Sequence, residues 1–170
     1  MTERLVLGIG NLHRGDDAVG RMAARLLRPR VDADVLVAER IGEATEVLAV
    51  LRNAKRGWLI DAAQTGSPLG TIHRIECSAA LGGVVPRSPV SSHGWGLAEA
   101  IGLARALDML PSYCIVYAIE TADFTAGAAP SLPVSDAAHR VAELILAELS
   151  SPPPPSIRHR LRRVPARDRR

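Results

Sequence analysis

The chain has 170 residues, of which 47% are hydrophobic, 23% are charged and 3% are aromatic, and its formal net charge is +3. This length suits one well-buried domain and is too short for two ordinary ones. So few aromatic side chains argue against a surface that stacks nucleic-acid bases, and no apolar run approaches the roughly 18 residues of a membrane span.

Apolar runs that suit buried strands alternate with stretches whose apolar residues recur at helical spacing. The first run begins within four residues of Met1, so we expect no secretory signal and a cytoplasmic protein. In chain order the expected elements are strand Arg4–Ile9, a helix from Asp17 with the apolar face Val19 to Leu27, strand Asp34–Ala38, helix Ala44–Leu51 ending in a basic turn at Lys55–Gly57, strand Trp58–Ile60, edge strand Thr71–Glu76, a long loop Leu81–Ser92, helix Leu97–Ala104, strand Tyr113–Ile119 and helix Val134–Leu149.

This alternation predicts the fold class. Strands joined by helices through short connections form parallel sheets covered on both faces. We therefore expect a single α/β domain over residues 1–150, with a mainly parallel, five-stranded twisted sheet in the doubly wound, phosphorylase/hydrolase-like arrangement. Residues 151–170 are a separate case, a proline-rich linker and an arginine-rich tail that we expect to be disordered.

The tail also explains the positive net charge. Residues 157–170 hold seven arginines and one aspartate, a local charge of +6, and subtracting this from +3 leaves −3 for residues 1–156. The folded part is therefore mildly acidic. The tail is interpreted as a solubilising end, with a docking arm for an acidic partner as the alternative.

Polar residues follow most of the expected strands, where ligands bind in open α/β sheets. They are Asn11, His13, Asp16 and Asp17 after the first strand, Asp61 and Gln64 after the third, Ser91, Ser92 and His93 before the third helix, and Glu120 and Asp123 after the last strand. Two carboxylates and an imidazole, from Asp17, Asp61 and His93, would suit a borderline divalent cation such as zinc or nickel.

Spacing alone leaves structural alternatives open for each of these residues. Asp16 or Asp17 could cap the first helix, Asp61 could accept hydrogen bonds from turn amides, and His93 could cap the third helix or lie on the surface. The segment Gly8–Gly20 departs from the dinucleotide motif GxGxxG, and its two acids would repel a pyrophosphate.

Two further enzyme classes receive little support. A GxSxG nucleophile elbow is missing from the sequence, so Ser91 or Ser92 with His93 is a poor serine-hydrolase candidate. Cys114 lies inside an apolar run and is interpreted as a core residue, and Cys77 lacks an evident base. The two cysteines form no CxxC motif, which suits a reducing compartment.

Three motifs in one order resemble the [NiFe]-hydrogenase maturation endopeptidases. They are GIGN followed four residues later by DDAVG (Gly8 to Gly20), LIDA around Asp61, and SSHG around His93. The likeness extends over roughly residues 4–149 and includes IETADFTAGAAPSLPVSDAA, which is similar to a degraded form of the family's closing segment.

The resemblance implies a protease that removes a C-terminal extension from the large-subunit precursor of a hydrogenase once nickel has been inserted. It implies that Asp17, Asp61 and His93 are the metal-binding and catalytic residues, with Asp16 as a supporting neighbour. Nickel would be recognised in the precursor and no permanently bound cofactor would be needed. We expect a monomer whose partner is that precursor, with no membrane and no nucleic acid involved.

The resemblance leaves two points open. The attacking water could be activated by metal polarisation of the scissile carbonyl or by a carboxylate base, Asp17 or Asp16. Family members often carry a DGGT-like turn after the second strand, whereas this chain has AERIGEATE, with only Gly42 retained. That loop is expected to shape the substrate cleft, so specificity could differ.

Two other functions remain as alternatives. The first is a non-proteolytic assembly factor that only checks the nickel state of the precursor. The second is a peptidyl-tRNA hydrolase, whose family also opens with a GLGN-like turn. For that family His13 comes too early and lacks the RHN context, and a folded part with a charge of −3 suits tRNA poorly.

Overall fold

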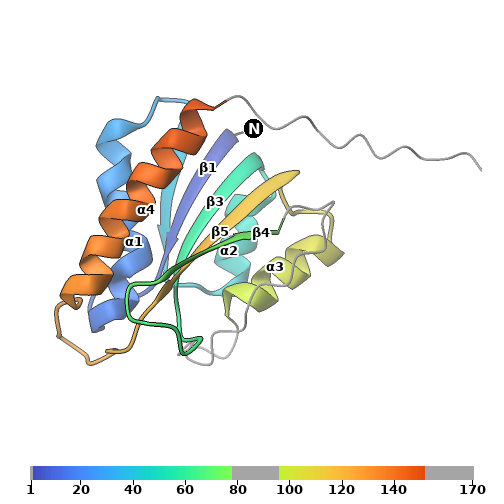
Figure 1. Ribbon diagram of the computed structural model, residues 1–170. Helices are drawn as coiled ribbons and strands as arrows, with labels where there is room; N and C mark the ends of the chain where they lie inside the picture. Colours follow the sequence, from blue (N-terminus) through green and yellow to red (C-terminus); the bar gives the residue numbers. More distant parts are fainter. Residues whose placement is uncertain (1, 78–95, 152–170) are drawn as a thin grey trace, which may run out of the picture.

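The computed structural model describes residues 2–77 and 96–151, which form an α/β domain (Figure 1). The predicted linker and tail, the loop Leu81–Ser92 and His93 lie outside the described residues. In chain order the elements are β1 (Thr2–Ile9), a 3-10 turn η1 (Gly15–Ala18), α1 (Val19–Leu27), η2 (Arg28–Arg30), β2 (Val35–Arg40), α2 (Ala44–Leu51), β3 (Ala54–Ala63), β4 (Ile72–Glu76), α3 (Leu97–Ala106), β5 (Tyr113–Glu120) and α4 (Leu132–Ser150).

The five strands form one sheet in the order β2-β1-β3-β5-β4. The pairs β1–β2, β1–β3 and β3–β5 are parallel, and β4 lies antiparallel to β5 at the edge. The chain builds outward from β1 to β2 and then returns to the other side of β1 with β3. The predicted fold class is confirmed, and the strand order reverses between β1 and β3.

Helices cover both faces of the sheet, with α1 and α4 on one face and α2 and α3 on the other (Figure 1). Side chains of one strand therefore alternate between two cores. Val6 packs with α1 and α4, whereas its neighbours Leu5 and Leu7 pack with α2 and α3. This double burial explains why the central strands are continuous apolar runs without polar alternation.

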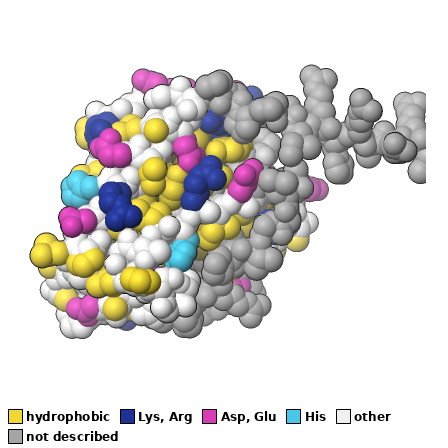
Figure 2. All heavy atoms as spheres, in the orientation of Figure 1, with side chains coloured by type: hydrophobic (Ala, Val, Ile, Leu, Met, Phe, Trp, Pro, Cys, Tyr) yellow, Lys and Arg dark blue, Asp and Glu magenta, His cyan; other side chains and the backbone are white. Residues whose placement is uncertain are grey.

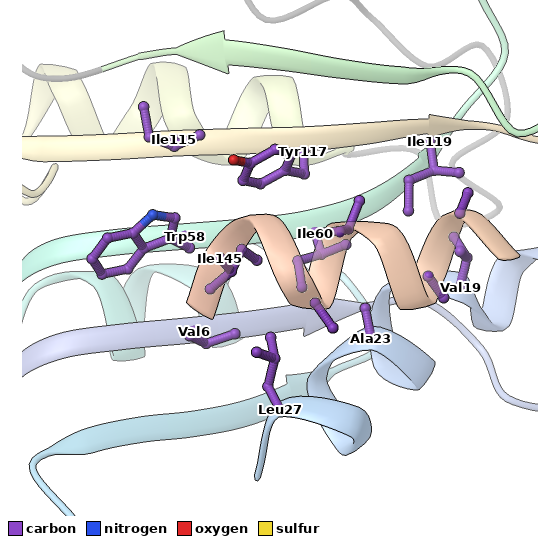
Figure 3. Close-up of a cluster of buried hydrophobic side chains, with 14 of the residues drawn as sticks. Val6, Val19, Ala23, Leu27, Trp58, Ile60, Ile115, Tyr117, Ile119 and Ile145 are labelled. Atoms are coloured by element: carbon purple, nitrogen blue, oxygen red, sulfur yellow. The ribbon is translucent and has the colours of Figure 1, made fainter. Parts of the chain in front are cut away.

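The core between the sheet and α4 is well filled (Figure 3). Ile145 of α4 faces the strands near Val6 and Ile60, and Leu27 of α1 closes the same layer. All four side chains have no solvent exposure. Each contributes about 1.5–3 kcal/mol through burial, so this layer fixes α1 and α4 against the strands.

A polar cluster ties the C-terminal end of α4 to the sheet. The Glu148 carboxylate accepts hydrogen bonds from Trp58 Nε1 at 2.7 Å, Tyr117 Oη at 2.5 Å and Arg74 Nε at 2.8 Å. Burial alone would raise the pKa of Glu148, but these donors outweigh it and hold that pKa below its ordinary value. Figure 2 shows charged side chains beside hydrophobic ones on this face of the molecule.

The structure corrects one predicted boundary. The segment Lys55–Gly57 was expected to be a basic turn, but it belongs to β3, which begins at Ala54. The Arg56 guanidinium lies over the Trp58 ring at 4.8 Å and the Tyr113 ring at 5.4 Å. Cation–π contact of this kind lets a basic residue lie within a strand, which charge alone does not indicate.

Candidate functional site

The carboxyl ends of the parallel strands meet at one edge of the sheet, at the bottom of the view in Figure 1. Four acidic residues lie on this edge: Asp16, Asp17, Asp61 and Glu120. Because the strand order reverses between β1 and β3, this edge is where an open α/β sheet offers space for a ligand. The surroundings of the four carboxylates differ, and that difference separates the candidates.

Two glycines bring the start of α1 against the strand ends. Gly10 has φ of +131°, and a Cβ there would lie 1.8 Å from the main-chain oxygen of Asp17. A Cβ on Gly20 would lie 2.3 Å from the carbonyl oxygens of both Ile9 and Ile60. Only glycine permits this backbone approach, so the GIGN–DDAVG segment places its two aspartates at the ends of β1 and β3.

Asp16 is buried and fully used in holding loops together. Its carboxylate accepts hydrogen bonds from the main-chain N–H groups of Ala122, Asp123 and Ser131 at 2.7–3.1 Å, and from Ser131 Oγ at 2.8 Å. Burial opposes ionisation, but these four donors hold the pKa of Asp16 below its ordinary value. Asp16 therefore anchors the segment between β5 and α4.

Glu120 plays the corresponding part for the turn between β3 and β4. Its carboxylate accepts hydrogen bonds from the N–H groups of Thr65 and Gly66 and from Thr65 Oγ1, all at 2.8–3.0 Å. Burial would raise the pKa of Glu120, yet the bonds from Thr65 and Gly66 lower it. Asp123, also expected at a strand end, is exposed and accepts the Thr125 N–H at 2.9 Å. Neither side chain is arranged for catalysis.

Asp17 points in a different direction from Asp16. Its carboxylate is half-buried, and Oδ2 accepts the Asn11 N–H at 3.0 Å. The helix-capping alternative is wrong for both aspartates, because the N-cap residue of α1 is Ala18. Asp17 instead lies across the turn that follows β1.

Asp61, at the end of β3, carries a carboxylate that is poorly supplied with donors. Among the described residues, the N–H of its neighbour Ala62, at 2.9 Å, is its hydrogen-bond donor. Burial raises the pKa of Asp61 to about 7; the Ala62 N–H partly offsets this, and the charge of Asp17 adds to it. The donor belongs to β3 and not to a turn, so the described residues do not supply the turn amides that were expected to bond Asp61.

Asp17 and Asp61 therefore form a coupled pair, distinct from the satisfied pair Asp16 and Glu120. Two neighbouring carboxylates that repel one another favour a proton or a cation at the site. They are two of the three residues that were expected to form it. His93 lies outside the described residues, and within residues 2–77 and 96–151 no group of three or more possible metal ligands occurs.

The structure also describes the remaining candidate residues from the sequence. His13 is exposed, and its main-chain N–H donates to Asn11 Oδ1 at 2.9 Å. Cys114 is buried in β5, as predicted, and Cys77 is also buried, with its N–H donating to the Cys114 carbonyl at 2.9 Å. Both cysteines are free thiols. Gln64 is half-buried after β3.

The sequence did not predict the hydrogen bonds between the GIGN–DDAVG segment and the segment that follows β5. The N–H of Asp16 donates to the Asp123 carbonyl at 2.7 Å, and the N–H of Gly127 donates to the His13 carbonyl at 2.8 Å. Arg14 and Ala126 form an isolated β-bridge. Both segments contain glycine, which was the only sign of this contact in the sequence. Nothing in their spacing indicates that the two segments lie side by side.

Comparisons with known proteins agree with the observed fold. Neither protein-family models nor curated protein sequences give a match. Among solved structures, the [NiFe] hydrogenase maturation protease HycI from Thermococcus kodakarensis is 24% identical, with a TM-score of 0.67, 88% of this chain and 94% of that chain covered. The hydrogenase maturating endopeptidase HybD from E. coli is 22% identical, with a TM-score of 0.69 and coverage of 86% and 91%.

A third similar structure is the hydrogenase 2 maturation peptidase from Thaumarchaeota archaeon SCGC_AB-539-E09. It is 22% identical, with a TM-score of 0.65, and the match covers 87% of this chain and 98% of that one. The chain thus shares, over nearly its whole described length, the α/β fold of these three proteins. No described helix is long and apolar enough to cross a membrane.

Proposed function

We propose that this protein is a hydrogenase maturation endopeptidase, which removes the C-terminal extension from a [NiFe]-hydrogenase large-subunit precursor after nickel insertion. The observation that carries the proposal is the coupled pair Asp17 and Asp61 at the point where strand order reverses. This pair lies on a fold shared with solved maturation proteases over 86–88% of the chain. The LIDA and DDAVG motifs that carry the sequence resemblance contain these same two residues.

Nickel of the precursor is the ligand that the pair suits. A divalent cation relieves the repulsion between the two carboxylates and displaces the proton that Asp61 holds near neutral pH. Two carboxylate oxygens with an imidazole from His93 offer nickel an open coordination shell without thiolate. Such a set binds free nickel loosely, so it probes a metal already held in the precursor and needs no resident cofactor.

The hydrogen bonds of Asp16 and Asp17 favour one of these two carboxylates as the base that activates the attacking water. Asp16 is a poor general base, because four hydrogen bonds occupy its carboxylate and its pKa is lowered. Asp17 differs from Asp16, since its carboxylate is half-buried and accepts the Asn11 N–H through Oδ2. In this proposal Asp17 and Asp61 bind the nickel-containing centre and Asp17 accepts the proton of the attacking water.

Co-expression with a nickel-loaded large-subunit precursor tests the proposal. Mass spectrometry of the large subunit should show loss of one defined C-terminal peptide with the wild-type protein. The variants Asp17→Asn and Asp61→Asn should leave the precursor intact, while Asp136→Asn, an exposed carboxylate on α4, should cleave normally. If the wild-type protein binds the nickel-loaded precursor without shortening it, the chain is an assembly factor and not a protease.

A further inference from the structure

An open cavity of about 460 Å³ lies at the carboxyl end of β2. It is lined by Arg21 from α1, Glu39 and Arg40 from the end of β2, Ile41, and Glu46 and Ala49 from α2. It therefore sits where the AERIGEATE segment replaces the DGGT-like turn of the resembling family. Neither Asp17 nor Asp61 lines this cavity, so it is a neighbouring site.

The charges in the lining are balanced, with Arg21 and Arg40 against Glu39 and Glu46, and two further arginines lie behind Glu39. Glu39 accepts hydrogen bonds from three arginines: Arg21 Nε at 3.0 Å, Arg25 Nε at 3.0 Å and Arg28 Nη2 at 2.9 Å. Burial would raise the pKa of Glu39, but Arg21 and Arg25 outweigh it, so this carboxylate is ionised and already neutralised. Arg25 and Arg28 do not line the cavity, so they supply positive charge from behind Glu39.

Arg40 adds a guanidinium that is available for a ligand. It is half-buried, and within the described chain its acceptor is the main-chain oxygen of Glu39, which receives Nη1 at 2.7 Å. A guanidinium carries five N–H donors in a planar fork that matches a carboxylate. Glu46, half-buried on α2, is the one acid of the lining besides Glu39, so the net positive charge near the cavity comes from Arg25 and Arg28.

The cavity is close enough to the coupled pair for one peptide to reach both. The Gly10 N–H donates to the Arg40 carbonyl at 3.1 Å, and the next residue, Asn11, donates to Asp17. Neighbouring strands lie about 4.8 Å apart, so the end of β2 is about 10 Å from the end of β3. An extended chain spans that distance with about three residues.

We propose that this cavity binds a carboxylate of the polypeptide substrate, within about three residues of the scissile bond, through Arg40 and Arg21. The assignment of the bound polypeptide as the substrate rests on the proposed function. The carboxylate comes either from an acidic side chain or from the free C-terminus of the extension, and both present the same planar pair of oxygens to the guanidinium groups.

Peptide binding to the full-length, metal-free protein tests this without any cleavage. The probes are acetyl-Ala-Ala-Glu-Ala-Ala-amide, the same peptide with glutamine, and acetyl-pentaalanine as free acid and as amide. We expect one carboxylate peptide to bind about tenfold more tightly than its uncharged partner. It should also shift the Nε–Hε NMR signals of Arg21 and Arg40. Which pair shows the preference identifies the source of the carboxylate.

Two variants make the result specific. Arg40→Gln should abolish the preference, while Arg140→Gln, an exposed arginine of α4, should retain it. The basic residues 157–170 are present in every protein, so a preference that they cause would persist in Arg40→Gln and overturn the proposal. Equal binding of charged and uncharged peptides would also overturn it. Because no cleavage is measured, failure of the protease assignment would not imitate either outcome.

Discussion

Asp16 and Asp17 are consecutive residues whose carboxylates accept hydrogen bonds from different segments of the chain. Asp16 accepts four hydrogen bonds from Ala122, Asp123 and Ser131, whereas Asp17 turns back to the Asn11 N–H. One acid therefore joins two loops, and the other is the proposed ligand. The double acid at the start of α1 thus combines an anchor with a candidate catalytic group.

Replacing Asp16 should destabilise the fold. Asp16→Ala leaves three main-chain N–H groups and a hydroxyl without their acceptor in a partly buried place, and a fully buried unsatisfied group costs about 1–3 kcal/mol. After relaxation we expect a loss of about 3 kcal/mol in the free energy of unfolding, measured by urea denaturation. Asp136→Asn, on the surface of α4, should change it by less than about 0.5 kcal/mol.

The stability should also depend on pH through Asp16. Its folded-state pKa is lowered, so the stability it provides is complete above its unfolded pKa and is lost as pH falls through the folded value. Urea midpoints measured between pH 6 and pH 3 should fall more steeply for wild type than for Asp16→Asn. Parallel curves would show that Asp16 is not a main source of the acid sensitivity.

Asp61 should titrate far above an ordinary aspartate. Burial, with the charge of Asp17, raises its pKa to about 7, which carboxyl ¹³C NMR of the metal-free protein can measure. Asp17→Asn should lower that pKa, because the repelling charge is removed. Since the folded-state pKa is raised, Asp61 lowers stability as pH rises towards 7, so Asp61→Asn should be more stable than wild type at pH 8. An Asp61 pKa near 4 would contradict the coupling.

Gly20 should be irreplaceable although it lies at the start of a helix. A Cβ would lie 2.3 Å from the carbonyl oxygens of Ile9 and Ile60, which are backbone atoms and cannot move aside easily. Gly20→Ala should therefore separate α1 from the strand ends, lower thermal stability and abolish precursor cleavage. Gly102, in α3, has nothing within 4 Å of a Cβ, so Gly102→Ala should be neutral or stabilise by up to about 1 kcal/mol.

Glu148 should hold α4 against the sheet. Glu148→Ala removes the acceptor of Trp58, Tyr117 and Arg74 and should cost about 2–3 kcal/mol. Trp58 fluorescence during urea unfolding reports the change directly. The matched control is Glu143→Ala on the same helix, whose ion pair with Arg30 is exposed and should contribute little to stability. Equal losses in the two variants would refute the anchoring role.

Much of the fold follows from local pattern in the sequence. The runs around Val6 and Val116 are apolar on both faces, and that pattern is sufficient to predict buried parallel strands between two helix layers. Arg56 shows where the pattern fails, because its charge suggested a turn and the contact with the Trp58 ring that keeps it in β3 is tertiary.

The sequence predicted where the acidic residues of the candidate site lie, but not which of them accept hydrogen bonds from the loops. Asp17 and Asp61 could be placed at one edge of the sheet because carboxyl ends of parallel strands meet there. Asp16 and Glu120 have the same side-chain chemistry, and only the loop amides that reach them, from residues up to 115 positions away, distinguish these anchors from the proposed ligands. Such long-range donors leave no periodic signal in the sequence.

The most direct test of the central claim is the mass of a nickel-loaded hydrogenase large-subunit precursor after incubation with each protein. With wild type and Asp136→Asn, we expect loss of a single C-terminal peptide. With Asp17→Asn or Asp61→Asn, we expect an unchanged mass. Cleavage that continues in both of these variants would contradict the assignment of Asp17 and Asp61 as the working pair.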